Sequence, residues 1–194
     1  MLQDLDSTLT AFLQQELPQD LLAQISISFA TPDNDFVTKT LNPPALNLFL
    51  YSIQENLEFR SSGWQTERQN GTAIRTPFPL RVDCSYLVTA WPGDVPNPEQ
   101  EEHYLLGEVM KVLMRYRQLP SEVIQGSLAG QDPAVRVLGL RPPQLQSIGE
   151  FWQAMGGKPK AALNYTVTIA VPVSEPSEPM PVAESGVDIR LSTK

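Results

Sequence analysis

The sequence predicts an α+β domain in which a single mixed, largely antiparallel central sheet is flanked by about three helices, with an extended C-terminal arm after it. Two observations predict this class. Segments with helical and with strand periodicity follow one another in the order helix, strands, helix, strand, helix, strand. The chain of 194 residues is long enough for one domain with a core, and its composition changes after Val173.

The first elements are a helix and two strands. Apolar residues at helical spacing predict an amphipathic helix over residues 3–17, which Pro18 ends. These apolar residues are Leu2, Leu5, Leu9, Phe12 and Leu13. The alternation in ISISF predicts a strand over residues 25–29. ALNLFLYSI predicts a second strand over residues 45–53, which is apolar on both faces and is therefore expected to be central.

An excursion over residues 60–79 precedes the clearest strand of the chain. Asn70-Gly71 is a strong tight-turn signal within it. The strand LRVDCSYLVTAW follows over residues 80–91, with Val82, Cys84, Tyr86 and Val88 on one face. The other face starts polar and ends half-apolar, which is typical of a strand that a helix covers over only part of its length.

The second helix is predicted to begin at Asn97. Asn97 is a favourable N-cap, Pro98 fits the first helical position, and Gln100 would complete a capping box. Acidic residues at the start and basic residues towards the end suit the helix dipole. Pro120 stops this run.

Three elements complete the domain. VRVLGL predicts a short strand over residues 135–140, and LNYTVTIAVPV predicts the last strand of the domain over residues 163–173. Between them a third helix is predicted, which Gly156-Gly157 closes. Its apolar residues are Leu145, Ile148, Trp152 and Met155.

The domain is predicted to span residues 1–173 and the C-terminal arm residues 174–194. The stretch SEPSEPMPVAESG is rich in Pro, Ser and Glu and cannot bury a core. The stretch VDIRL nevertheless alternates like a strand, with Val187, Ile189 and Leu191 on one face. We expect this strand to dock outside its own domain by adding to an exposed sheet edge; the alternative is a disordered tail without a partner.

Composition excludes several classes of function. The net charge of -8 repels phosphate backbones, so no nucleic acid partner is expected. Cys84 is the only cysteine, which excludes a disulfide framework and favours a reducing compartment. No apolar run reaches the ~18 residues that a membrane span needs. The acidic start MLQDLDSTLT lacks the basic region of a signal peptide, so none is expected.

Candidate catalytic or metal-binding groups are few. His103 is the only histidine, and together with Glu99 or Glu102 it falls short of the three or four clustered ligands of a transition-metal site. Cys84 lies in the middle of a strand with no base predicted beside it, which is typical of an inert core thiol. GSLAG, residues 126–130, is one step out of register with a nucleophile elbow. No catalytic residue, metal site or cofactor is predicted.

Charge is distributed unevenly along the chain. Residues 1–38 contain six acidic residues and no Lys or Arg, whereas residues 60–81 contain four arginines and one acid. These arginines are Arg60, Arg68, Arg75 and Arg81. One interpretation is salt bridges within the monomer; the other is a head-to-tail contact between copies that closes a ring. Ion pairs at the rim of an interface are weak, so apolar contact is expected to supply most of the affinity, with Trp64 as the candidate.

Five blocks of sequence resemble, in order and spacing, the cap or tail-terminator proteins of extracellular contractile injection systems, which are phage-tail-like particles. The blocks are LNLFLYSIQENLEFRSSGW, NGT followed by prolines, LRVDCSYLVTAW, EEHYLLGEVMKVL and FWQAMGGKPKAALNYTVTIAVPV. The resemblance covers about residues 5–173, nearly the whole predicted domain.

The resemblance implies a tail-terminator-like fold and a non-enzymatic structural role. Proteins of this family form a hexameric ring at the end of the particle distal to the baseplate, where they contact the last layers of inner tube and sheath and end their growth. The resemblance implies cytoplasmic assembly into a particle, either free or membrane-anchored, and no catalytic residues. The expected subunit and partner contacts are Arg60, Trp64, Arg68, Arg75, Val187, Ile189 and Leu191. The alternative function is a soluble enzyme or small-ligand binder, which would need a deep pocket with perturbed titratable groups.

Overall fold

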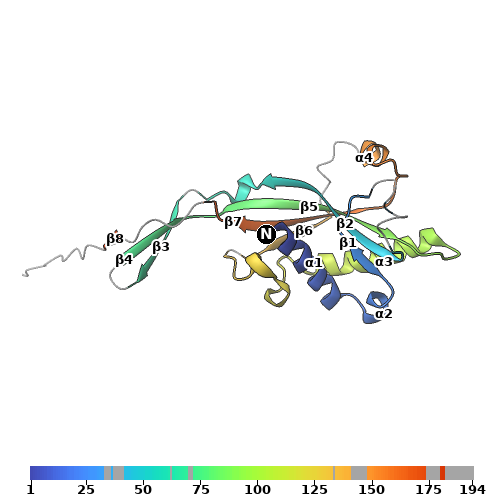
Figure 1. Cartoon of the computed structure of the whole chain (residues 1–194), viewed down its shortest axis with the longest axis horizontal. Coiled ribbons are helices and arrows are strands. Elements are labelled where there is room, and N and C mark those ends of the chain that lie inside the picture. The colour runs from blue at the N-terminus through green and yellow to red at the C-terminus, as the bar shows by residue number, and fades with distance from the viewer. Residues whose placement is uncertain are drawn as a thin grey trace, which may run out of the picture.

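The computed structural model describes residues 1–32, 36, 42–61, 63–69, 72–132, 134–140, 148–173 and 180–181, without the side chains of residues 67–69, 72, 180 and 181. In it a sheet-centred body carries a narrow projection (Figure 1). The predicted residues Leu145, Val187, Ile189 and Leu191 lie outside the described part of the chain.

A five-stranded sheet forms the centre of the body, in the order β1-β2-β5-β7-β6. Its strands are β1 (Ser26–Ser28), β2 (Ala45–Glu55), β5 (Leu80–Trp91), β6 (Arg136–Gly139) and β7 (Leu163–Val171). Only the β1–β2 pair is parallel; the three other pairs are antiparallel. The predicted mixed, largely antiparallel sheet is therefore confirmed, and each of its strands lies within two residues of the predicted bounds.

Helices and short turns cover one face of this sheet (Figure 1). These elements are α1 (Leu2–Glu16), α2 (Gln19–Leu22), α3 (Pro98–Arg115) and the 3-10 turns η3 (Ser121–Val123) and η4 (Gly126–Leu128). The helices predicted at residues 3–17 and from Asn97 are thus confirmed. Asn97 is the N-cap of α3, but its side chain makes no capping hydrogen bond, so the predicted capping box is wrong.

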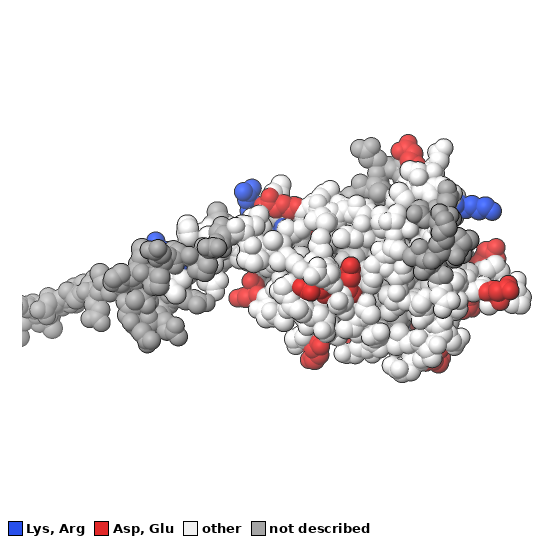
Figure 2. All heavy atoms as spheres, viewed as in Figure 1, with Lys and Arg blue, Asp and Glu red and all other residues white. Residues whose placement is uncertain are grey.

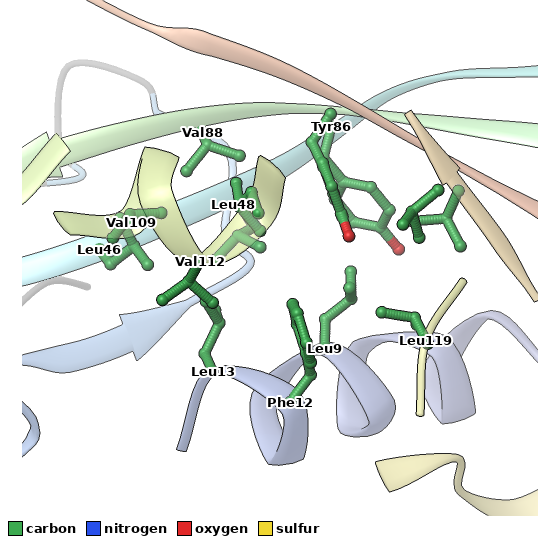
Figure 3. Packing of buried hydrophobic residues seen from close by; sticks show 14 of the residues in the cluster. Leu9, Phe12, Leu13, Leu46, Leu48, Tyr86, Val88, Val109, Val112 and Leu119 are labelled. Carbon is green, nitrogen blue, oxygen red and sulfur yellow. The ribbon is translucent and has the colours of Figure 1, made fainter. Parts of the chain in front are cut away.

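The main core lies between this helical layer and the sheet. Leu9, Phe12 and Leu13 of α1 point towards Tyr86 and Val88 of β5 (Figure 3). All five side chains are fully buried. Because complete burial of such a side chain stabilises the fold by roughly 1.5–3 kcal/mol, this layer accounts for much of the stability of the body.

Within the described residues, a helix covers the opposite face of the sheet at one end only (Figure 1). Helix α4 (Ile148–Ala154) lies there, and its Phe151 ring packs 5.9 Å from that of Phe49 on β2. Towards the other end the same face is polar, and the hydroxyls of Ser85 and Thr166 are hydrogen-bonded at 3.1 Å. This division confirms the expectation that a helix covers the second face of β5 over only part of its length.

A second sheet of three strands makes the projection (Figure 1). Its strands are β3 (Trp64–Gln69), β4 (Thr72–Pro77) and β8 (Met180–Pro181). β3 and β4 form an antiparallel pair that closes with Gln69 opposite Thr72, on either side of the predicted Asn70-Gly71 turn. We call β3 and β4 the projecting hairpin. The sequence predicts a turn here but not the two strands.

Candidate functional site: a surface at the base of the projecting hairpin

The lone cysteine is a core residue. The Cys84 side chain has no exposed surface, and burial raises the pKa of its thiol to about 12, with smaller contributions from the charges of Asp83 and Asp6. The thiolate is the nucleophilic form of cysteine, so such a pKa keeps the group in its unreactive form near neutral pH. The prediction that Cys84 is buried is confirmed.

The histidine lies on an exposed turn of α3, beside a cavity of about 620 Å³. Within the described residues, no three His, Cys, Asp or Glu side chains are grouped as a metal site would need. Lys160, which also lines this cavity, forms an ion pair with Glu102 and lies 4.7 Å from the centroid of the Trp91 ring. These contacts fasten the loop after α4 to α3 and to the end of β5.

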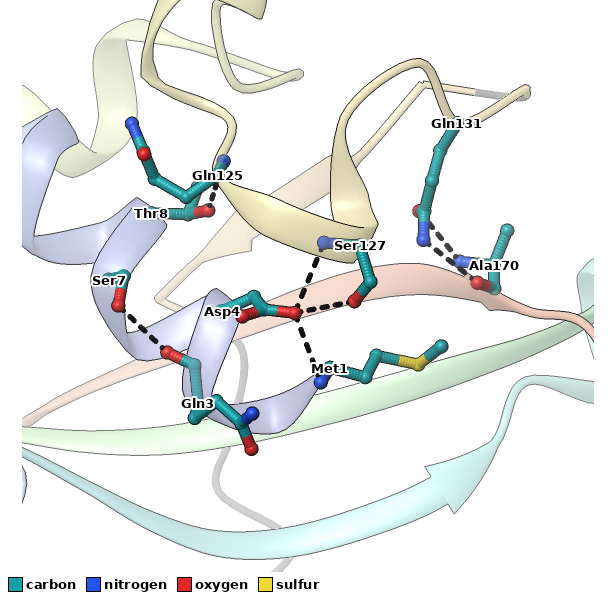
Figure 4. A network of polar contacts seen from close by, with 9 residues as sticks. All are labelled: Met1, Gln3, Asp4, Ser7, Thr8, Gln125, Ser127, Gln131 and Ala170. Atoms are coloured by element: carbon teal, nitrogen blue, oxygen red, sulfur yellow. Dashed lines mark hydrogen bonds and ion pairs between the residues drawn. The ribbon is translucent and has the colours of Figure 1, made fainter.

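The GSLAG segment anchors α1 to the body. Ser127 donates to Asp4 Oδ2 from both its backbone N–H (3.1 Å) and its hydroxyl (2.5 Å), and the Met1 amino group lies 3.1 Å from the same oxygen (Figure 4). The hydroxyl bond is the largest of the contacts that lower the pKa of Asp4 to about 2. Gly126 has a φ of +55°, and a Cβ there would lie 2.6 Å from Asp4 Cγ. Ser127 therefore has a structural partner in α1.

Three acids of the N-terminal segment are engaged within the chain. Asp6 accepts a hydrogen bond of 3.0 Å from the Tyr86 hydroxyl, and its pKa is raised by burial. Glu16 pairs with Arg115 at 2.8 Å. Asp4 is likewise bound to Ser127. For three of the six acids, these contacts favour the interpretation that the acidic residues of this segment find their partners within the monomer.

Large apolar side chains are exposed around the base of the projecting hairpin. Five large hydrophobic side chains at this end of the sheet are exposed, Leu57 by 67% and Trp64 by 58%. We call them the base patch: Ile53, Leu57, Trp64, Phe78 and Val173. An exposed apolar cluster of this kind is typical of a surface that binds another protein.

Three of the arginines that the sequence singles out lie near this patch or along the hairpin. Arg60 is 62% exposed, and its Nε lies 3.5 Å from Glu55 Oε1. Arg75 is exposed on β4 and pairs in register with Thr66. Arg68 lies on β3 opposite Ala73. Figure 2 shows carboxylates spread over the body, and a basic side chain next to acidic ones where the hairpin leaves it.

A cavity of about 300 Å³ lies beside the base patch and is lined by three arginines. They are Arg60, Arg81 and Arg136. Arg81 is only 3% exposed, while the guanidinium carbon of Arg136 lies 4.6 Å from the centroid of the Phe59 ring. Arg136 cannot be recognised as a cavity residue from the sequence, because it reaches the cavity from β6, far along the chain from Arg60.

Asn56 holds one wall of this cavity in place. Its side-chain oxygen accepts a hydrogen bond of 3.1 Å from the backbone N–H of Phe59, which caps the 3-10 turn η2 (Leu57–Phe59). Its side-chain amide donates to Asp83, and Asp83 also accepts a bond of 2.6 Å from the Thr168 hydroxyl. The polar end of the sheet thereby fixes the ring on which Arg136 rests.

Two solved structures are similar to the whole chain. One is the sheath/tube terminator of the extracellular contractile injection system PVC in its extended state, with 27% identity and a TM-score of 0.68 over 100% of this chain and 65% of that chain. The other is the tube-terminating cap of the anti-feeding prophage, with 25% identity and a TM-score of 0.64 over 98% of this chain and 60% of that chain. The present chain thus spans less than two thirds of the length of either neighbour.

Both neighbours are terminator or cap proteins rather than enzymes, in agreement with the expectation of a non-enzymatic protein with a tail-terminator-like fold. No curated protein matches the sequence. In the part of the chain that the structure describes, no helix is long and apolar enough to cross a membrane. The sequence model of the Pvc16 N-terminal domain matches residues 4–184, and the chain belongs to that family.

Proposed function

We propose that this protein is a non-enzymatic structural cap that closes the distal end of a contractile injection system. In this role it binds the last layers of inner tube and sheath as a hexameric ring. The observation that carries the proposal is the extent of the likeness. Two terminators of such particles match 100% and 98% of the chain, at identities of 27% and 25%.

The surface at the base of the hairpin supports a role in assembly. Interfaces between proteins are enriched in aromatic residues and arginine at their centres, and the base patch places Trp64 and Phe78 beside an arginine-lined cavity. We assign Arg60, Trp64, Arg68 and Arg75 to the contact between neighbouring copies. Trp64 supplies most of the affinity, because exposed ion pairs contribute little.

The C-terminal arm is assigned to the partner contact. A cap must satisfy the open strand edges of the final layer, since unpaired edges otherwise recruit further chains. Strand addition provides affinity through backbone hydrogen bonds, and Val187, Ile189 and Leu191 alternate so that they can fill pockets on one face. The subunits assemble in the cytoplasm and become part of a particle.

Electron microscopy of particles from a strain that lacks this protein tests the function. We expect tubes and sheaths of irregular length without a closed distal end, and a return to uniform length when the gene is supplied again. Native mass measurement of the purified chain tests the ring, which should contain about six copies. Capped particles of normal length in the deletion strain would refute the proposed function.

A further inference from the structure

We propose that the arginine-lined cavity at the base of the hairpin receives carboxylate side chains from a second copy of this chain, supplied by the start of α3 around Asp94 and Glu99. The inference rests on the proposed function, because it specifies how neighbouring copies in a ring would meet. It identifies a different acidic partner from the N-terminal segment that the charge pattern first suggests.

The cavity carries excess positive charge. Arg60, Arg81 and Arg136 line it together with one acid, Glu58, and Arg60 is also close to Glu55. The pKa of the Arg81 guanidinium is lowered, first by burial and then by the positive charge of Arg136, while Asp83 and Asp132 act in the opposite direction. A carboxylate placed beside the two guanidinium groups would relieve this repulsion and could accept paired N–H bonds from the exposed Arg136.

The surroundings of the cavity suit a side chain presented by another protein. Phe59, Phe78 and Pro79 form apolar walls, and the volume of about 300 Å³ accommodates side chains rather than a large ligand. Of the base patch, Phe78 lines this cavity, and contact of a second copy with it would exclude water. Exclusion of water strengthens a central ion pair, because charges interact more strongly where the dielectric constant is low.

The acidic partner surface lies at the start of α3. Asp94 and Glu99 are exposed there, next to the exposed apolar side chains of Val95 (37%) and Tyr104 (52%). Glu102, further along the helix, already pairs with Lys160. The acids of α1 are less suitable partners, because Asp4, Asp6 and Glu16 bind groups of their own chain.

The two surfaces lie at opposite ends of one strand. Arg81 is the second residue of β5, and Asp94 follows three residues after β5 ends at Trp91. A strand of 12 residues spans about 40 Å at roughly 3.3 Å per residue, so one copy cannot satisfy its own cavity. Contact between two different surfaces is head-to-tail, and such contacts close into a ring when the rotation between copies permits.

Complementary variants provide the test. Arg136→Glu blocks the cavity, and Asp94→Asn combined with Glu99→Gln blocks the acidic surface without creating a positive partner for the carboxylate introduced in the cavity; the three replaced side chains are exposed, so the fold should persist. Arg60→Glu is a second cavity variant if the first is unstable. At the concentration where the unmodified protein assembles, each blocked protein alone should sediment as a monomer. Its assembly should need a protein concentration about tenfold higher or more. A mixture of the two should form dimers of twice the 21.5 kDa chain and nothing larger, since each dimer retains only blocked ends.

Lys111→Glu and Glu122→Lys are the matched controls, because they reverse exposed charges away from both surfaces and should assemble like the unmodified protein. Assembly of either blocked protein at the control concentration would overturn the inference. So would a mixture that stays monomeric, or an unmodified chain that is monomeric at every concentration. None of these results refutes the capping role, which the length of particles in the deletion strain tests separately.

Discussion

The side-chain amide of Asn56 donates to both carboxylate oxygens of Asp83, at 3.1 and 3.0 Å. Asn56 follows directly after β2, and Asp83 lies on the neighbouring strand β5. The side-chain oxygen of Asn56 accepts a hydrogen bond from the backbone N–H of Phe59. The backbone N–H of Asn56 donates to the Arg81 carbonyl at 2.7 Å. One side chain thus joins the sheet to the turn that forms the wall of the arginine-lined cavity.

Replacement of this side chain should loosen that end of the sheet. We expect Asn56→Ala to lower the free energy of unfolding by about 2 kcal/mol, because it removes bonds to a charged acceptor from a residue that is 8% exposed. Urea denaturation measures the change. Gln54→Ala, two residues earlier and exposed, is the control and should stay within ~0.5 kcal/mol of the unmodified protein. Equal effects of the two changes would contradict the structural role of Asn56.

Stability in acid should depend on Asp4 and Ser127. The pKa of Asp4 is lowered from 3.8 to about 2 in the folded state, so its contribution to stability is complete above pH 3.8 and is lost as the pH falls towards 2. We expect Ser127→Ala to reduce stability at pH 6 and to have little effect at pH 2. Denaturation at several pH values measures this difference, with Ser121→Ala as the control. A loss that is the same at pH 2 and pH 6 would contradict the linkage.

Replacement by alanine should change the stability of the protein in opposite directions at two glycines. Gly126 has a φ of +55°, and a Cβ there would lie 2.6 Å from Asp4 Cγ, so Gly126→Ala should destabilise the protein by roughly 1–3 kcal/mol. Gly107 lies within α3 with nothing near its Cβ position, and Gly107→Ala should stabilise the helix by roughly 0.5–1 kcal/mol. Thermal unfolding compares the two. A neutral Gly126→Ala variant would show that the close contact with Asp4 relaxes easily.

Most elements of the body were predictable from the sequence, because each is long or strongly periodic. Apolar spacing alone locates α1, and the alternation of β5 gives its bounds, Leu80–Trp91, without error. The projecting hairpin was missed apart from its turn, since β3 reads WQTERQ and has no apolar alternation. Its strands are identified by their pairing with each other, which the periodicity of a single strand does not reveal.

The candidate site was predictable only in part. Arg60 and Trp64 belong to the arginine-rich segment of residues 60–81, and the structure places both at the base of the hairpin. Arg136 and Asn56 gain their roles through contacts with Phe59 and Asp83 that tertiary structure creates. The engagement of Asp4 and Asp6 likewise depends on partners more than 75 residues away in the chain, which a linear charge count cannot reveal.

Assembly should depend on the exposed tryptophan of the base patch. Trp64 is 58% exposed, and truncation of a large aromatic side chain at the centre of an interface typically costs more than 2 kcal/mol of binding free energy, or about thirtyfold in affinity. We therefore expect Trp64→Ala to shift rings towards monomers in sedimentation. Met114→Ala removes a side chain that is 56% exposed on α3 and should leave the rings intact. An unchanged ring population in Trp64→Ala would contradict the assignment of this residue to the contact between copies.

Removal of residues 176–194 should separate folding from assembly. Among the described residues, the core cluster lies before this segment, and β8 pairs with β4 through Met180 and Pro181, opposite Ala73 and Thr72. We therefore expect the truncated protein to unfold at nearly the same temperature as the full chain, but to form weaker rings or to bind sheath less tightly. A full-length variant with Ile189→Asp and Leu191→Asp should reproduce the defect, because it removes the apolar face of the terminal strand and keeps the arm. Arg190→Ser changes the opposite face and is the matched control. If the truncated chain assembles and caps particles as well as the full chain does, the arm has no partner.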